Sequence, residues 1–176
     1  MKNIFFLVVI CSLCGCIPGL EEDSSGNTAE WSGPVNKAGF PEVAGRYSFF
    51  QTDQVQECSD GGVENIPDSA SNISVSQDGN KLIAESEIDL AEDGVFTINE
   101  DSKEESGLVG KTGKFSYSTS VKANISGRPE EIILTSSING VFKADSWEGT
   151  TRFVFAVPSD FFSCTTDGKF SGDKLN

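Results

Sequence analysis

Residues 114–126 read KFSYSTSVKANIS and alternate more clearly than any other long stretch of the chain. The in-phase positions are Phe115, Tyr117, Thr119, Val121, Ala123 and Ile125. Because successive side chains of a β-strand point to opposite faces, a period of two predicts a long strand with one buried face.

The next two segments repeat this pattern. Residues 127–129 (GRP) and 144–146 (ADS) predict turns, which separate strands over residues 131–142 and 147–157. The in-phase positions are Ile132, Leu134, Ile138 and Phe142, followed by Trp147, Gly149, Thr151, Phe153, Phe155 and Val157. Three long strands joined by short turns predict an antiparallel sheet.

Shorter strands are predicted on both sides of these three. They cover residues 46–52, 71–76, 81–87, 95–99, 163–166 and 169–172, with loops over 54–67 and 100–113. Asp78-Gly79 and Asp167-Gly168 predict tight turns, since glycine takes a positive φ at little steric cost. The fold class is therefore all-β, an antiparallel meander of eight or nine strands. We expect a small up-and-down barrel, with a β-sandwich as the alternative.

Residues 1–16, MKNIFFLVVICSLCGC, have the pattern of an export signal. Lys2 supplies a positive charge, and the apolar run over residues 4–10 is shorter than the roughly 20 residues that span a bilayer. Leu13-Cys14-Gly15-Cys16 resembles the lipobox of bacterial lipoproteins. The resemblance implies cleavage before Cys16 and acyl chains such as palmitate on Cys16, which would anchor the protein to a lipid bilayer.

The same resemblance carries an expectation about location. In lipoproteins of Gram-negative bacteria, Asp directly after the lipidated cysteine often marks retention in the inner membrane, and here that position is Ile17. The resemblance thus implies the outer membrane, facing either the periplasm or the cell surface. In a Gram-positive source the same anchor would lie on the plasma membrane.

Composition predicts three regions. Residues 1–15 form the signal peptide, residues 16–40 a flexible tether rich in Gly, Ser, Asn, Pro and acids, and residues 41–176 one β-domain. Trp31 is the one tryptophan of the tether, and it either docks on the domain or lies free.

Cys58 and Cys164 are the cysteines left after lipidation. In an oxidising exported compartment, an isolated pair predicts a disulfide. Two free thiols are the alternative. Since Cys58 follows the first predicted strand and Cys164 lies near the last, a bond between them would bring the first and last strands together, as barrel closure requires.

Charge and composition exclude several functions. The net charge of −14 disfavours binding to nucleic acid, whose backbone is anionic. The chain contains no histidine, which rules out Ser-His-Asp and Cys-His catalysis and the usual zinc and copper sites. We therefore expect no catalytic residues and no cofactor apart from the lipid on Cys16. Arg152, on the polar face of its strand, is expected to be solvated rather than to bind an anion.

A calcium site is a candidate in residues 89–100, DLAEDGVFTINE. In an EF-hand loop, Asp89, Asp93 and Glu100 would be ligands one, five and twelve. Ala91 removes the third ligand, and flanking helices are not evident. The favoured interpretation is a hairpin turn with solvated acids.

Short motifs of the domain resemble those of lipocalin-like barrels. Gly45-Arg46-Tyr47 resembles the Gly-x-Trp sequence that opens their first strand, with Tyr in place of Trp. Residues 140–142 (GVF), 147–150 (WEGT), Cys164 and residues 168–172 (GKFSG) resemble the ending of many bacterial lipoproteins. The resemblance implies a barrel and carries no catalytic residues.

Three hypotheses about function follow. The first is a non-enzymatic envelope lipoprotein that binds a partner protein, an envelope component or a small apolar ligand. The second is a lipocalin-like carrier of a small apolar ligand. The third is a hydrolase that uses carboxylates, which requires two acids about 5–10 Å apart in a cleft. An internal void of several hundred Å³ would favour the carrier, whereas a filled barrel would favour the first hypothesis.

Overall fold

Nine β-strands make up the structure, a computed structural model that describes residues 31–86, 96–126 and 130–175. The strands are β1 Gly45–Cys58, β2 Val63–Ile66, β3 Ser69–Asp78, β4 Lys81–Ser86, β5 Phe96–Val109, β6 Lys114–Ile125, β7 Glu131–Phe142, β8 Ser146–Val157 and β9 Phe162–Leu175. One short 3₁₀ turn, η1 Pro158–Asp160, connects β8 to β9. No helix in these ranges has the length and apolar character needed to cross a membrane.

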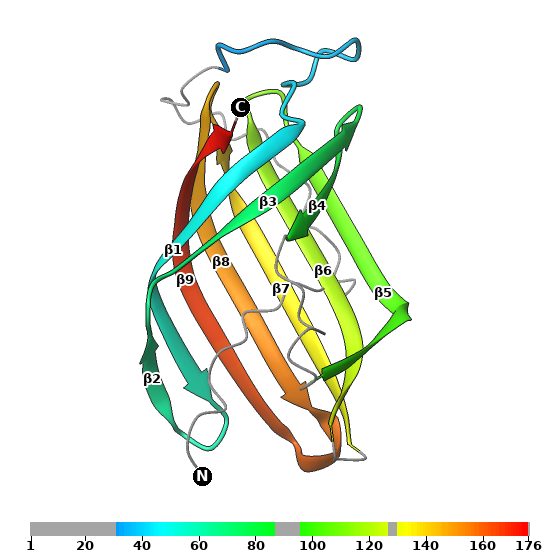
Figure 1. The fold of residues 1–176 in the computed structure, drawn as a ribbon, viewed down its shortest axis with the longest axis vertical. Coiled ribbons are helices and arrows are strands. Elements are labelled where there is room, and N and C mark those ends of the chain that lie inside the picture. Colours follow the sequence, from blue (N-terminus) through cyan, green and yellow to red (C-terminus); the bar gives the residue numbers. More distant parts are fainter. Residues whose placement is uncertain (1–30, 87–95, 127–129, 176) are drawn as a thin grey trace.

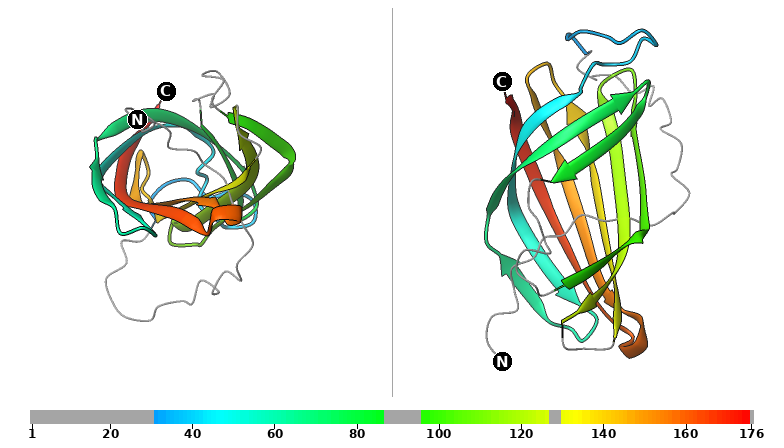
Figure 2. Two further views of the ribbon diagram at one scale, coloured as in Figure 1. Left: turned by 90° about the horizontal axis from the view of Figure 1, so that it is seen from below. Right: turned by 45° about the vertical axis from the view of Figure 1, so that its right-hand side comes forward.

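The strands form a closed antiparallel barrel of eight strands with one extra strand (Figure 1). The ring runs β1-β3-β4-β5-β6-β7-β8-β9, and β9 pairs back onto β1. The extra strand, β2, pairs with the end of β1. An end-on view shows the strands around the ring (Figure 2, left). Closure removes the exposed sheet edges that a sandwich would leave, so the predicted barrel is confirmed and the sandwich alternative is wrong.

The two ends of the barrel differ in the segments that they carry. The capped end carries residues 31–44 and lies at the top of Figure 1, whereas the far end carries η1 and the turn between β1 and β2. The two halves of the barrel are named after these ends.

The β1 strand is longer than expected, and part of the predicted loop over residues 54–67 is strand. It continues to Cys58 because a bulge at Asp53, where φ is 51°, restores the alternation and the pairing with β9 beyond it. One extra residue shifts the phase, which hides the second half of the strand from a search for period two.

The predicted loop over residues 100–113 is also wrong, because β5 runs to Val109. It pairs with β6 through two registers separated by a second irregularity between Asn99 and Glu104. Most side chains of residues 100–106 are exposed, so no apolar alternation marks this part of the strand. Backbone pairing with β6 defines it instead.

The predicted turn at Asp167-Gly168 lies within the continuous strand β9. Asp167 points outward and accepts two hydrogen bonds from Arg152, both 2.8 Å long. A Cβ atom on Gly168 would lie 3.0 Å from Gln54 Cγ and 3.2 Å from Thr151 Oγ1. The glycine therefore makes room inside the barrel and does not turn the chain.

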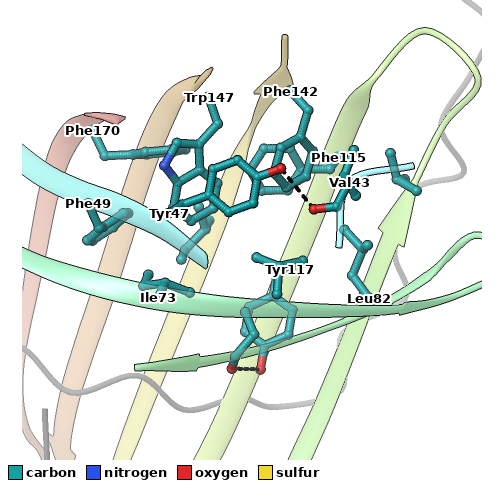
Figure 3. Close-up of a cluster of buried hydrophobic side chains, with 14 residues drawn as sticks. Val43, Tyr47, Phe49, Ile73, Leu82, Phe115, Tyr117, Phe142, Trp147 and Phe170 are labelled. Atoms are coloured by element: carbon teal, nitrogen blue, oxygen red, sulfur yellow. Dashed lines mark hydrogen bonds between the residues drawn. The ribbon is translucent and has the colours of Figure 1, made fainter. Parts of the chain in front are cut away.

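The capped half is filled by aromatic side chains (Figure 3). Their ring centroids lie 4.4–6.3 Å apart, and each side chain is 5% exposed or less. The group consists of Tyr47, Phe49, Phe115, Phe142, Trp147 and Phe170. Tyr47 Oη donates a hydrogen bond to the Val43 carbonyl and Trp147 Nε1 to the Ser48 carbonyl, each 2.8 Å long, so their polar atoms are satisfied.

Residues 31–44 cover the capped end. Trp31, within the predicted tether, packs against the aromatic core, and Val43 is fully buried. The segment folds back on itself through a bridge between Val35 and Pro41. Asn36 Nδ2 ties it to the β3–β4 turn by donating a 2.8 Å hydrogen bond to the Gly79 carbonyl. Trp31 therefore docks on the domain.

Candidate functional site

The far half of the barrel is lined by a second set of inward-facing side chains, which we call the far lumen. Pairing across β5 to β9 places them on one face, because directly opposed residues share a side of the sheet. The set is Ile98, Val121, Ala123, Ile125, Ile132, Leu134, Phe153, Phe155, Val157 and Phe162.

Several members of the far lumen keep part of their surface exposed although they point inward. Phe153, Phe155 and Phe162 are each only partly buried, as are Ile98 and Ile125. Solvent therefore reaches apolar surface inside this half. The aromatic core of the capped half shows no such exposure.

The strand pairing explains why this half is accessible. The β3 strand pairs with β1 only as far as Gln51, and below that point β2 takes its place. On the other side of the ring, β4 and β5 share a single paired position, Lys81 with Leu108. Among the described residues, no pairing joins β2 to β5, so the hydrogen-bonded wall of the far half runs from β2 through β1 and β9 to β5.

Between the two halves lies a layer of uncharged polar side chains, which we call the polar layer. Its members point inward by register, and all except the half-buried Gln56 are 8% exposed or less. The layer consists of Gln51, Gln54, Gln56, Thr119, Ser136, Thr151 and Thr166. A core built only for packing would place apolar residues here, as the capped half does.

The hydrogen bonds within the polar layer are mostly long. Gln51 Nε2 donates to Thr151 Oγ1 at 3.3 Å, and Thr166 Oγ1 donates to Gln56 Oε1 at 3.4 Å. The usual separations are about 2.7–3.0 Å, so these bonds are weak. One contact is tighter, the 2.9 Å bond from Gln54 Nε2 to the Pro67 carbonyl.

Two atoms of the polar layer have no hydrogen-bond partner among the described residues. They are Gln54 Oε1 and Thr119 Oγ1, and their side chains are only 3% and 1% exposed. A buried polar atom without a partner costs roughly 1–3 kcal/mol, and such atoms are few in folded proteins. These two therefore call for a functional explanation.

Charged groups border the polar layer on one side. Glu105 is paired with Thr119 and thus faces inward from β5, and its Oε2 lies 3.2 Å from Lys103 Nζ. The Tyr117 hydroxyl, 2.9 Å from the Ala84 carbonyl, also lies 3.3 Å from the same carboxylate oxygen. Neither the polar layer nor the far lumen contains Lys or Arg.

Arg152, in contrast, faces outward. Its guanidinium forms the bidentate pair with Asp167, whose hydrogen bonds lower the pKa of Asp167 and raise the pKa of Arg152. Both side chains are more than half exposed, so this pair adds little stability. The guanidinium charge of Arg152 is paired with the Asp167 carboxylate on the outer surface of the barrel.

Cys58 and Cys164 are brought together as expected. Their Sγ atoms lie at the disulfide distance of 2.04 Å, and the two residues are directly paired across β1 and β9. The pair shares an inward row with Phe155, so it lines the far lumen. The first and last long strands of the ring are thereby joined.

Most of the other predicted site residues lie outside the part of the chain that the structure describes, so the calcium prediction stays a prediction. Cys16, Asp89 and Asp93 lie outside the described residues, and Glu100 is exposed on β5. Within the described ranges, no group of three or more Cys, Asp or Glu side chains is placed to hold a metal ion. On the lumen side, Glu64 and Glu105 stand on β2 and β5, the strands at the two limits of the far-half wall.

Comparison of the chain with protein-family models, curated proteins and solved structures finds no match.

The polar layer was missed by sequence reasoning. Thr119 and Thr151 were in phase with their strands, but threonine is common in strands and does not signal a site. Gln54 and Gln56 fell in a predicted loop because of the bulge at Asp53. The alternation of Gln51, Gln54 and Gln56 becomes visible only when the extra residue is allowed for.

Proposed function

We propose that this chain is a lipid-anchored envelope protein whose barrel carries a small, elongated, mainly apolar ligand in its far half. The supporting observation is the partial exposure of Phe153, Phe155 and Phe162, which point into the barrel. Inward aromatic surface left in contact with water is unfavourable, and a ligand that covers it gains about 25 cal/mol per Å² of buried apolar area. No reaction is assigned to the protein.

The carrier is favoured over a barrel that serves only as a surface for partners. A barrel used only from outside can fill both halves, as the aromatic core fills the capped one. Aromatic side chains are available for packing in both halves, since β8 and β9 supply them to each. Apolar surface that solvent can reach in the far half is what supports the carrier.

Binding of Nile red, an uncharged apolar dye that fluoresces in dry surroundings, tests this proposal. We expect the wild-type protein to bind the dye, and Phe155→Glu to weaken the binding about tenfold or more, because a carboxylate in an apolar site must be desolvated. Phe50→Glu is the matched control, since Phe50 faces outward and is 44% exposed. It should leave dye binding unchanged.

The two variants distinguish dye binding in the lumen from nonspecific dye binding to the outer surface. Equal loss of dye binding in both variants, or no binding by the wild-type protein, would contradict the carrier. Circular dichroism and the thermal midpoint establish that Phe155→Glu has folded. Phe162→Ala provides a milder change at the same site.

The anchor is the second part of the proposal and rests on the lipobox-like sequence before Cys16. We expect the protein extracted from bacterial membranes to have a mass that begins at Cys16 and includes acyl chains. Cys16→Ser should abolish the added mass and release the protein from the membrane fraction. An unlipidated wild-type mass would contradict the anchor and the outer-membrane location, while leaving the carrier to be judged by the dye.

A further inference from the structure

The polar layer points to a particular class of ligand. We propose that the far half of the barrel selects a long-chain lipid with an uncharged head group that has several hydrogen-bonding groups, such as a monoacylglycerol, and that this head lies against the polar layer. The inference rests on the proposed carrier function and adds the chemistry and orientation of the ligand.

Two buried atoms of the polar layer need hydrogen-bond partners. Gln54 Oε1 can only accept a hydrogen bond, and Thr119 Oγ1 can both donate and accept. The long bonds from Gln51 to Thr151 and from Thr166 to Gln56 can be exchanged at little cost for better ones. A head group with hydroxyls supplies the donor that Gln54 lacks.

The two atoms without partners lie on different sides of the barrel. Four pairings separate β1 from β6 around the ring in either direction, so Gln54 and Thr119 lie on opposite walls. A single hydroxyl cannot bond to both walls, whereas a head with two or more separated hydroxyls can. The far lumen on one side of this layer then receives the apolar chain.

The charges around the polar layer disfavour an anionic head group. A fatty-acid carboxylate would have to be desolvated, and neither the polar layer nor the far lumen offers Lys or Arg to pair with it. Two acids face the lumen at this level, Glu64 opposite Gln56 and Glu105, whose carboxylate lies 3.2 Å from Lys103 Nζ. An anionic head is therefore disfavoured and an uncharged head is favoured.

Displacement of Nile red by defined lipids tests the inference. Monopalmitoylglycerol, hexadecanol and palmitate share a chain length and differ in the head, and each is added below the concentration at which it forms micelles. We expect monopalmitoylglycerol to displace the dye at about tenfold lower concentration than hexadecanol, because it has additional hydrogen bonds to make. Palmitate should be the weakest of the three.

Substitutions in the polar layer locate the head group. Thr119→Val and Gln54→Leu should each weaken monopalmitoylglycerol about fivefold to tenfold while leaving Nile red binding unchanged, because the dye has no such head. Ser116→Ala is the matched control, since it removes another unpartnered hydroxyl of β6 from an outward position and should change neither. Thr119→Val preserves the shape of the side chain, so it serves where Gln54→Leu does not fold.

The outcomes distinguish this inference from the function on which it rests. If the wild-type protein does not bind Nile red, the carrier fails and the ligand class fails with it. If Nile red binds but palmitate displaces it as well as monopalmitoylglycerol does, the ligand class alone is wrong. Unchanged lipid binding in both polar-layer variants would also overturn it, and would assign the two unpartnered atoms to bound water.

Discussion

At the scale of single residues, burial sets the chemistry of the barrel interior. Tyr47 is 1% exposed in the aromatic core and donates its hydroxyl hydrogen to the Val43 carbonyl (Figure 3). Burial, with a smaller contribution from the charge of Asp145, raises the pKa of Tyr47 to about 12. The folded state therefore holds this proton over a range in which the unfolded chain releases it.

The stability of the protein should fall at alkaline pH for this reason. Below about pH 10, Tyr47 is neutral in both states, and between about pH 10 and 12 only the unfolded state loses the proton. The free energy of unfolding thus decreases as pH rises through this window. Denaturant titrations at several pH values should show a smaller decrease for Tyr47→Phe than for the wild-type protein. Equal slopes would contradict the assignment to Tyr47.

Gly149 has no side chain, which leaves space for the ring of Phe170. A Cβ atom there would lie 2.8 Å from Phe170 Cε1 and would clash with the Asn139 carbonyl. We expect Gly149→Ala to lower the free energy of unfolding by about 1–3 kcal/mol, as overpacking does. Denaturant unfolding measures this loss, and an unchanged midpoint would show that the neighbours can move.

At the scale of elements, β1 and β9 form the seam that closes the ring. Their pairing runs from Arg46 with Leu175 to Cys58 with Cys164, interrupted by the bulge after Thr52. The disulfide lies at the far end of this seam, where β1 is also flanked by β2. The disulfide therefore holds β1 and β9 together in the far half. On the other side of this half, no pairing among the described residues joins β2 to β5.

Removal of the disulfide should destabilise the protein without abolishing the barrel. The double variant Cys58→Ser/Cys164→Ser should lose about 2–4 kcal/mol of unfolding free energy, since the bond restricts a long loop of the unfolded chain. The remaining β1–β9 hydrogen bonds should keep the far-ultraviolet circular dichroism strand-like. Reduction of the wild-type protein serves as the control and should lower stability to a similar extent.

At the scale of the whole molecule, the barrel is divided into a filled half and an accessible half. The capped half is closed by β3, β4 and residues 31–44, and its core is buried. The wall of the far half is formed by β5 to β9 and the second half of β1, and the disulfide joins β1 to β9 within it. We expect the capped half to have the higher local stability, because local stability depends on buried apolar contacts and protected hydrogen bonds.

Amide hydrogen exchange should therefore vary along the same strands. In β6 and β8, amides near Phe115 and Trp147 should exchange more slowly than those near Ile125 and Phe155. The short strand β4, with its single paired position on β5, should exchange faster than β7. Uniform protection would contradict the division. Addition of Nile red should slow exchange in the far half specifically if the lumen binds it.

The sequence by itself determined the all-β class, the three long strands of β6 to β8 and the cysteine pair. The class and the strands follow from local rules, since alternation and turn residues act between neighbours along the chain. The cysteine pair follows from position, since Cys58 and Cys164 are the two cysteines of the predicted β-domain. The sequence also placed Phe153 and Phe155 on an inward face, without showing whether they are covered.

Only the tertiary structure decided the continuation of β1 past Asp53, the strand character of β5 and the role of Gly168. In each case the deciding partner is distant in sequence: β9 for β1, β6 for β5, and Gln54 with Thr151 for Gly168. The polar layer arises in the same way. Its seven side chains come from five strands of the described barrel and meet only when the ring closes, because no local pattern records which residues will face one another across it.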